Sequence, residues 1–600
     1  MDWDLAAYFP AFDGPEMRRF KADLRDDLDA LLTDASGTAD LNPGNLEVWE
    51  HIVLSFEDAV TRLRHLGSYV SCITSADANN EDFAAEEGAF SLLDARMSKI
   101  LVELQRGLKT PSDEVFEAFT SRPALRDARY RITRIREQSR HTMSTEEEHL
   151  ASDLGVDGIE AWGRLYDRIS GKLTFEMTYP DGRRVQVPMA QRRALMEHPD
   201  RRVRRAAFEG GNKAWTSIET VPAAALNAIG GTRLTLYRHR GMDHYLDKAL
   251  FQAAISRETL DAMFEAVFSE IDVARDILAY KAHLMGGDTL GWYDLSAPLT
   301  VENQDEPSWE DARALVYRAF AAGYPALADY TNETFEQKWI DWSPRPGKRP
   351  GAFCTGSPLT KESRVYMTYN DSMGDVLTLA HELGHAFHGH LMRGERTLNR
   401  AYPMTLAESA STFGEMLLMR GLLEEPGVSA ETRAFLLNLE ASDGATYLMD
   451  IPVRFEFEKA FHEERADGEV GVSRLKEMMV DTQRRVLGNV LDPEGGDPYF
   501  WASKLHFYIT DTTFYNFPYT FGYLLSRGLF AQYEKEGPDF LPRYEQYLKL
   551  TGRDTAENVV RQTIGLELTE PGFWSDAIRG LEGVLERLKS SVDKSRAVLN

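Results

Sequence analysis

Apolar residues recur at helical spacing through most of this chain. Positions three and four apart share one face of an α-helix, so such series predict amphipathic helices. We predict long helices across residues 15–110, with the polar stretch 75–82 reversing the chain between two antiparallel helices. Two of the supporting series are Leu46, Trp49, Ile52, Val53 and Phe56, and Leu92, Met97, Ile100, Leu101 and Leu104.

Helical patterns continue to the end of the chain. Residues 256–285 predict one long helix opened by Ser256, and the final third is also helical. There is no internal repeat and no low-complexity tract. The fold is therefore predicted to be predominantly α-helical.

Short extended segments interrupt this pattern at two places. Residues 173–179 and 184–188 flank a Pro-Asp-Gly turn and predict a β-hairpin. Residues 352–356 and 364–369 read as two further short strands. An exposed strand edge there can take up an extended peptide as an added strand, and the alternative is an ordinary structural hairpin.

Size and charge limit the class of protein. A chain of 600 residues exceeds what one hydrophobic core usually serves, so at least two domains or lobes are expected. The formal net charge is −27, which disfavours a nucleic-acid partner because such proteins present a basic face.

Cysteine usage and the absence of long apolar runs indicate the compartment. Cys72 and Cys354 are the two cysteines, too few for a disulfide scaffold, and we expect reduced thiols. A redox role for Cys354 is weighed against a buried, unreactive thiol, and the second is preferred. The first residues lack the pattern of a signal peptide, and no apolar run approaches ~18 residues. We therefore predict a cytoplasmic protein without a membrane partner.

The sequence VLTLAHELGHAFH at 376–388 carries the clearest chemical signal. It places His-Glu-x-x-His in an apolar helical run, so His381 and His385 lie one turn apart on one face and can hold one metal ion. Glu382 lies beside them, where it can take a proton from a zinc-bound water. Two neutral imidazoles suit Zn²⁺, one per chain, and a catalytic site needs one more protein ligand and an open position. A chance pattern on a structural helix is the alternative.

Spacing along the chain limits which residues can be the third metal ligand. A metzincin site requires Gly and His where this chain has His388 and Leu391, so that form does not apply. The remaining acids downstream are Glu395, Glu408 and Glu415. We predict Glu408 as the ligand and Glu415 as a partner that accepts a hydrogen bond from one of the imidazoles. His388 is expected to make a supporting hydrogen bond, because a fourth ligand would close the site.

An aromatic segment at 506–523 offers donors for the oxyanion that forms when a carbonyl is attacked. Such a stripe alone is usually core packing. Beside a zinc hydrolase motif, its polar-tipped residues become candidate substrate contacts, with Pro518 expected to disturb helical regularity. The candidates are His506, Tyr508, Tyr515, Tyr519 and Tyr523.

Together these segments resemble the M3 family of zinc oligopeptidases, in the branch of bacterial oligoendopeptidase F. The resemblance rests on 381–388 and 406–415, and extends more weakly through 68–71, 291–295 and 506–522. It implies a predominantly α-helical, two-lobed zincin, with a small β-sheet beside the active-site helix and a deep substrate channel. It further implies an N-terminal helical lid lobe at 1–195, including the hairpin near 173–188, and a zinc-peptidase catalytic lobe at 196–600.

The same resemblance implies an activity. Folded proteins cannot enter a deep channel, so the implied enzyme is an endopeptidase acting on short unstructured oligopeptides. The resemblance supports Glu408 as the third ligand and suggests that a strand near 352–354 aligns the peptide backbone. The segment FPYTFG at 517–522 replaces the Gly-Tyr-rich loop of the thimet-oligopeptidase branch. Which aromatic candidate meets the oxyanion therefore stays open.

Two other functions remain as alternatives. One is a zinc-dependent carboxypeptidase or dipeptidyl carboxypeptidase. The other is a helical peptide-binding protein with a vestigial site, against which the intact His381, Glu382, His385 and Glu408 argue. Oligopeptides are the predicted partners, and the predicted state is a monomer, with a dimer as the alternative.

Overall fold

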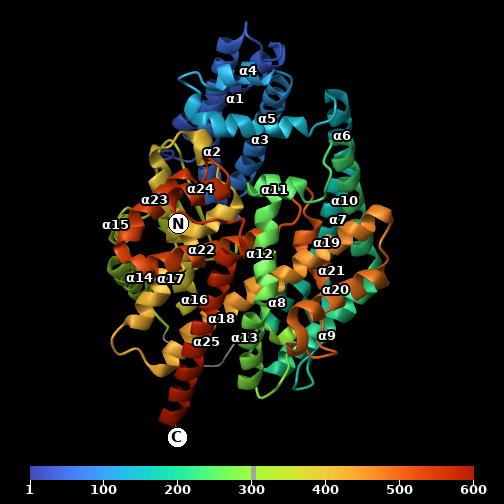
Figure 1. Ribbon diagram of the computed structural model, residues 1–600, viewed down its shortest axis with the longest axis vertical. Coiled ribbons are helices and arrows are strands. Elements are labelled where there is room, and N and C mark those ends of the chain that lie inside the picture. The colour runs from blue at the N-terminus through green and yellow to red at the C-terminus, as the bar shows by residue number, and fades with distance from the viewer. Residues whose placement is uncertain (299–305, 600) are drawn as a thin grey trace. The chain divides into compact units, whose positions relative to one another are not determined.

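A computed structural model describes residues 1–298 and 306–599, which form two compact units (Figure 1). Unit 1 comprises the described parts of Met1–His141, Asp305–Gly427 and Leu529–Glu567. Unit 2 comprises the described parts of Thr142–Gln304, Val428–Gly528 and Leu568–Asn600. This division differs from the expected single boundary near residue 195. The N-terminal helices share a hydrophobic core with Leu398, far along the chain, so sequence order does not separate the units. A lid function for 1–195 stays a prediction.

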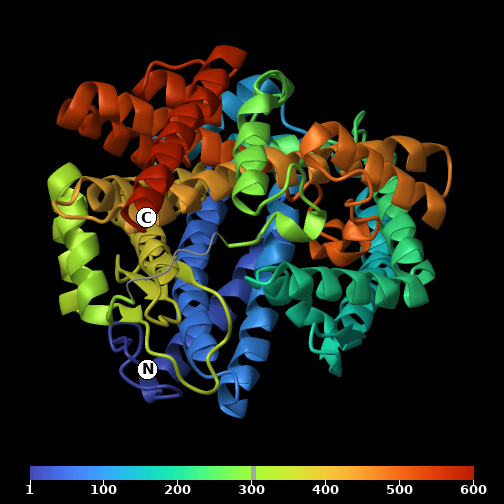
Figure 2. The same cartoon turned by 90° about the horizontal axis from the view of Figure 1, so that it is seen from below.

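Unit 1 begins with three long helices that pack against one another, drawn in blue in Figure 2. They confirm the helices expected across 15–110 and the polar break between the second and third. The helices of unit 1 are α1 (Pro15–Gly37), α2 (Leu46–Ala76), α3 (Glu81–Lys109), α4 (Asp113–Thr120), α5 (Arg129–Arg140), α14 (Trp309–Gly323), α15 (Pro325–Glu336), α16 (Met373–Leu391), α17 (Met404–Glu424), α23 (Leu541–Leu550) and α24 (Ala556–Thr563).

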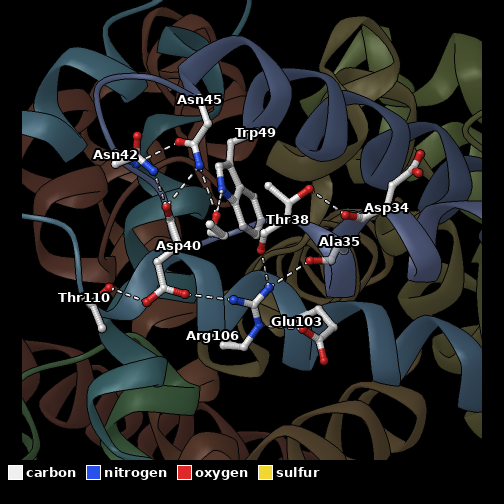
Figure 3. A network of polar contacts seen from close by, with 11 residues as sticks. Asp34, Ala35, Thr38, Asp40, Asn42, Asn45, Trp49, Glu103, Arg106 and Thr110 are labelled. Atoms are coloured by element: carbon white, nitrogen blue, oxygen red, sulfur yellow. Dashed lines mark hydrogen bonds and ion pairs between the residues drawn. The ribbon is translucent and has the colours of Figure 1, made fainter.

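A polar network fastens the α1–α2 connection to α3 (Figure 3). Arg106 on α3 donates to the carboxylate of Asp40 at 2.8 Å and to the carbonyls of Ala35 at 2.8 Å and Thr38 at 2.9 Å. The indole of Trp49 donates to the carbonyl of Ala39 at 3.0 Å. The guanidinium thus adds a donor to the carbonyl of Ala35 in the last turn of α1, which otherwise accepts only the backbone N–H of the C-cap residue Thr38 at 3.4 Å, and it binds the carbonyl of Thr38 itself.

The predicted strands at 352–356 and 364–369 form part of a three-stranded sheet in unit 1. Its order is β3 (Ile340–Asp341), β5 (Ser363–Tyr366) and β4 (Phe353–Gly356), with β5 buried at the centre. β4 pairs antiparallel with β5, and no other described strand pairs with β4. One edge of β4 therefore has no strand partner among the described residues, and β4 contacts α16 and α2.

Helix α16 carries the His-Glu-x-x-His motif and is well capped. The Ser372 hydroxyl accepts a hydrogen bond from the backbone N–H of Asp375 at 3.1 Å, and the Asp375 carboxylate lies in the first turn, where the helix dipole favours negative charge. The helix then packs directly on α17, and both are labelled in Figure 1.

Glycines allow the backbones of α16 and α17 to touch. A Cβ at Gly384 would lie 2.4 Å from the carbonyl oxygen of Ala410, and one at Gly414 would lie 2.9 Å from that of Ala380. Any side chain larger than hydrogen would push the helices apart. The close approach brings residues in the first turns of α17 beside the motif.

Unit 2 is also helical and contains the predicted hairpin. Strands β1 (Thr174–Thr178) and β2 (Arg184–Pro188) pair antiparallel, and Gly182 takes the positive φ of +85° that the turn requires. The helices are α6 (Thr145–Asp157), α7 (Ile159–Lys172), α8 (Arg192–Met196), α9 (Arg201–Ile218), α10 (Thr220–His239), α11 (Asp247–Ala253), α12 (Arg257–Ser269), α13 (Ile271–Leu284), α18 (Ala430–Ala445), α19 (Ile451–Asp467), α20 (Val472–Leu487), α21 (Phe500–Ser503) and α25 (Pro571–Leu599), while α22 (Phe517–Glu536) continues from unit 2 into unit 1.

The helix expected across 256–285 is two helices, α12 and α13. They are separated at Glu270, whose backbone leaves the helical conformation at φ −101° and ψ 16°. Neither Gly nor Pro marks this position, so the apolar pattern contained no signal for the break. None of the helices in the described ranges is long and apolar enough to cross a membrane.

The α16–α17 contact leads to a first prediction. Gly384→Ala should destabilise unit 1 by at least about 1–3 kcal/mol, because the new methyl group meets backbone that has no room to move. It should also weaken metal binding, since the predicted ligands lie on both helices. Thermal unfolding by circular dichroism and a metal titration measure the two effects.

The matched control is Gly374→Ala on the same helix, where the nearest atom to the new Cβ is 3.7 Å away. This change should leave the melting temperature the same or slightly higher, since alanine favours a helix over glycine by roughly 1 kcal/mol. Equal melting temperatures for both variants would contradict the steric argument.

Candidate metal centre

The structure brings the three predicted metal ligands together. His381 and His385 project from α16 and Glu408 from α17, and one potential ligand atom of each lies within 4.8 Å of the others. The Nε2 atoms of His381 and His385 are 3.4 and 3.5 Å from Oε2 of Glu408. Two imidazole nitrogens and one carboxylate oxygen form the donor set of a catalytic zinc site, so these residues fit a single Zn²⁺.

Glu415 occupies the supporting position that the sequence suggested. It lies two turns beyond Glu408 on α17, and its Oε1 accepts a hydrogen bond from Nδ1 of His381. This bond selects the tautomer of His381 whose Nε2 is free to bind a metal. Ser411 donates to Oε2 of Glu408 at 2.8 Å and restrains that carboxylate as well.

The electrostatics of the group favour a bound cation. Burial alone would lower the pKa of His381, but the hydrogen bond that His381 donates to Glu415 and the charges of Glu415, Glu382 and Glu408 raise this pKa to about 9. Burial disfavours ionisation of Glu408, yet its hydrogen bond and charge interaction with His385 hold the pKa of Glu408 down to about 2. Without a metal, the carboxylates therefore attract a proton to the imidazole, and Zn²⁺ would replace that positive charge.

The carboxylate of Glu382 differs from that of Glu408 in its surroundings. Its side chain is 5% exposed, and its Oε2 is buried without a hydrogen-bond partner among the residues described. Burial raises the pKa of Glu382, which makes it a stronger base than a solvated carboxylate. A buried, unpartnered carboxylate oxygen next to the ligand set has the properties expected of a general base.

A cavity of about 450 Å³ contains these groups. His381, Glu382, His385 and Glu408 form part of its wall, and β4 contributes residues 353–356. The open edge strand therefore lies on the same cavity as the ligand set. Arg64, Arg400 and Tyr402 also line it, and sequence reasoning missed them because no motif connects these positions.

Other residues near the motif do not join the ligand set. His388 donates from Nε2 to the carbonyl of Leu548 at 3.0 Å, and burial lowers its pKa to about 3, so it is a neutral core residue on the side of α23. Glu395 pairs with Arg553 at 2.5 Å. Cys354 lines the cavity, but burial raises the pKa of its thiol well above the usual range, as expected for an unreactive thiol.

Three of the five aromatic candidates form a cluster in unit 2. The ring centroids of His506 and Tyr515 are 5.3 Å apart, those of Tyr515 and Tyr519 are 5.5 Å apart, and those of His506 and Tyr519 are 6.2 Å apart. Arg454 donates to Nδ1 of His506 at 3.2 Å, which leaves the proton of the neutral ring on Nε2. Burial and the charges of Arg454 and Lys504 lower the pKa of His506 to about 4, so it is neutral at pH 7.

Tyr508 and Tyr523 lie outside this cluster. Tyr508 stacks on Tyr166 with centroids 3.6 Å apart, and its hydroxyl is sealed from solvent. Tyr523 stacks on Tyr447 at 4.5 Å and is also buried. We withdraw Tyr508 from the catalytic candidates, because a hydroxyl enclosed by protein cannot meet a peptide.

The disturbance expected at Pro518 is not what separates Tyr515 from the helix. α22 begins at Phe517, so Tyr515 precedes it and only Tyr519 and Tyr523 are helical. Pro518 lies in the first turn, where a missing N–H costs nothing, and it does not disturb the helix.

Comparison with known sequences identifies a family. The profile of peptidase family M3 matches residues 194–579, more than half of the chain, and a profile described as oligopeptidase F matches residues 108–175. The chain is similar to oligopeptidase PepF of Bacillus subtilis, with 24% identity over 90% of this chain and 81% of that protein. It is also similar to an oligoendopeptidase F homolog of Lactococcus lactis, with 23% identity over 95% of each chain.

Comparison with solved structures supports the fold. The crystal structure of oligoendopeptidase-F from Enterococcus faecium matches with a TM-score of 0.70 at 20% identity, over 96% of this chain and 99% of that one. The predominantly helical fold with a small sheet is thus confirmed. At this identity, the likeness to the solved structure is evidence of fold alone.

The ligand set leads to a second prediction. Glu408→Ala should abolish stoichiometric zinc binding, because only two of the three protein ligands, both imidazoles, would then remain to hold the ion. Glu415→Ala should keep the ligands and weaken zinc binding by about 10–100-fold, since it removes the group that orients His381. Competition with a chromophoric chelator measures both affinities.

Glu395→Ala is the matched control, because it removes a nearby carboxylate that is paired with Arg553. Its zinc affinity should equal that of the unmodified protein. Complete loss of zinc in Glu415→Ala with retention in Glu408→Ala would reverse the assignment of the two glutamates.

Proposed function

The chain belongs to peptidase family M3 and is a metallo-oligopeptidase, and we propose that it is a zinc-dependent endopeptidase that cuts internal bonds of short unstructured oligopeptides. One observation carries this proposal. A His₂Glu donor set and a buried, unpartnered Glu382 line one cavity beside an open strand edge. A cytoplasmic location and a monomeric state, with a dimer as the alternative, stay predictions.

His381, His385 and Glu408 would hold the zinc ion in this proposal. When bound there, zinc supplies Lewis acidity, which activates water and polarises the scissile carbonyl. Glu415 keeps Nδ1 of His381 protonated, so Nε2 stays available throughout the reaction.

Glu382 moves the proton. Its buried carboxylate accepts a proton from the attacking water as the new C–O bond forms. It then delivers that proton to the amide nitrogen as the C–N bond breaks. The pKa of Glu382, raised by burial, suits both steps better than that of a solvated carboxylate.

β4 orients the substrate in this proposal. Its open edge offers backbone donors and acceptors to an extended peptide, which would add to the sheet as a further strand. Backbone pairing does not depend on side chains, so a substrate of almost any sequence can bind in this way. The substrate must also be unfolded, so that its backbone is free to pair with β4. Short unstructured peptides meet both conditions.

His506, Tyr515 and Tyr519 stay the proposed oxyanion donors, as the sequence suggested. Neutral His506 carries its proton on Nε2, and Tyr515 and Tyr519 carry hydroxyls beside it. Donors of this kind stabilise the negative charge that develops on the carbonyl oxygen. We favour Tyr519, because α22 gives it a rigid support.

The third prediction concerns the base. Glu382→Gln should keep zinc bound and lower kcat by at least about 100-fold, because the amide cannot accept the water's proton. Cleavage of a quenched fluorescent peptide and metal analysis measure both quantities. Glu395→Gln is the matched control and should cleave normally; full activity in Glu382→Gln would refute the assignment.

Product analysis of a peptide blocked at both ends tests the endopeptidase class. Internal cuts identified by mass spectrometry support the proposal. Cleavage of free-ended peptides alone, two residues or one residue from the C-terminus, would instead identify a dipeptidyl carboxypeptidase or carboxypeptidase. Tight binding without any cleavage in the presence of zinc would identify a peptide-binding protein.

The fourth prediction concerns the oxyanion donor. Tyr519→Phe should lower kcat by about 10²–10³-fold with little change in KM, since the lost hydrogen bond forms only as negative charge develops. Tyr508→Phe removes a hydroxyl enclosed against Tyr166 and should leave kcat unchanged. Equal effects of the two substitutions would exclude a specific role for Tyr519.

A further inference from the structure

Two arginines on the wall of the metal cavity have no counter-ion among the residues that the structure describes. Arg64 projects from α2, and Arg400 ends the short 3₁₀ turn Thr397–Arg400 that contacts α2. Both side chains are partly buried. Within 1–298 and 306–599, neither forms an ion pair or a hydrogen bond with another residue.

Neighbouring arginines on the same elements are paired. Arg62, two residues before Arg64, lies 2.7 Å from Asp27 and 2.8 Å from Asp58. Arg396, four residues before Arg400, binds the carboxylate of Glu57. With 95 acidic residues against 68 basic ones, the chain has carboxylates to spare. Arg64 and Arg400 nevertheless line the cavity without a partner among the described residues, whereas Arg131, which also has none there, lies off the cavity wall.

Leaving these charges uncompensated costs free energy, because partly buried cations are normally paired. Burial and the positive charges of Arg131 and Arg400 lower the pKa of the Arg64 guanidinium to about 10, which reflects that cost. The acidic residues that line the cavity are Glu382 and Glu408, and neither pairs with Arg64 or Arg400. Those two carboxylates already serve as the proposed base and ligand.

We propose that Arg64 and Arg400 form a carboxylate-binding subsite, so that the enzyme prefers oligopeptides with a carboxylate near the scissile bond. This proposal rests on the peptidase function proposed above. The carboxylate is either the C-terminal α-carboxylate of the peptide or the side chain of an aspartate or glutamate. Both present the same planar pair of oxygens, which a guanidinium binds through two parallel hydrogen bonds.

Two matched peptide pairs distinguish the sources of the carboxylate. The first pair differs only in a free C-terminal acid or an amide. The second pair is blocked at both ends and differs in glutamate or glutamine at each position flanking the cleaved bond. The unmodified enzyme should cleave the carboxylate member of at least one pair with kcat/KM about 10–100-fold higher, as expected for one charge-assisted contact.

Arg64→Gln and Arg400→Gln should each reduce that ratio towards one, chiefly by lowering kcat/KM for the carboxylate member of the pair. Arg131→Gln is the matched control, because Arg131 lies near Arg64 without lining the cavity. It should keep the preference. No preference in either pair, an unchanged preference in both arginine variants, or an equal loss in Arg131→Gln would overturn the subsite.

Binding separates this inference from the proposed activity. Fluorescence anisotropy with labelled peptides on Glu382→Gln should show the same carboxylate preference without turnover. If the unmodified protein cleaves nothing but binding keeps this preference, the peptidase function fails and the subsite stands. If peptides are cleaved without preference, the subsite fails and the function stands.

Thermal unfolding provides a readout independent of peptides. Because the two charges lack partners, Arg64→Gln and Arg400→Gln should melt at the same temperature as the unmodified protein or higher. Marked destabilisation in both would mean that the arginines stabilise the fold and would overturn the proposal. Arg64→Lys and Arg400→Lys keep the charge and lose the two-pronged contact, so an intermediate preference is expected from them.

Discussion

The contact between the backbones of α16 and α17 is the constraint on which the metal centre depends. Gly384 and Gly414 let the two helices approach until a Cβ would collide with carbonyl oxygens across the interface. At that separation, Glu408 reaches His381 and His385, and Glu415 reaches the other face of His381. Both glutamates act through the same helix packing, so the ligand set and its support form a single rigid assembly.

The cavity has carboxylates around the imidazole of His381 and two arginines on its wall. The carboxylates of Glu382, Glu408 and Glu415 surround an imidazole and favour a cation, as the pKa of His381, raised to about 9, indicates. Arg64 and Arg400 line the same cavity, have no partner within the described ranges and favour an anion. The proposed binding of a metal and of a charged peptide would use both properties. Functional sites commonly retain such uncompensated groups at a cost in stability.

Burial and ring packing divide the aromatic candidates into two groups. His506, Tyr515 and Tyr519 cluster, and Arg454 fixes the imidazole tautomer. Tyr508 and Tyr519 carry the same phenol hydroxyl, but the ring of Tyr508 is stacked on Tyr166 and its hydroxyl is enclosed by protein. Side-chain type alone cannot distinguish the two, because a tyrosine serves equally well in a core and at a surface.

Local pattern determined the helices, both strand pairs, and the ligands that lie one turn apart on α16, because these depend on contacts between residues close in sequence. It also narrowed the third ligand to a few acids. Tertiary structure decided the rest. The break at Glu270, the division into two units, the burial of Tyr508 and the placement of Arg64 beside Arg400 all depend on packing between segments far apart in the chain. No spacing in a single sequence records such contacts, since the residues that meet are brought together by the fold.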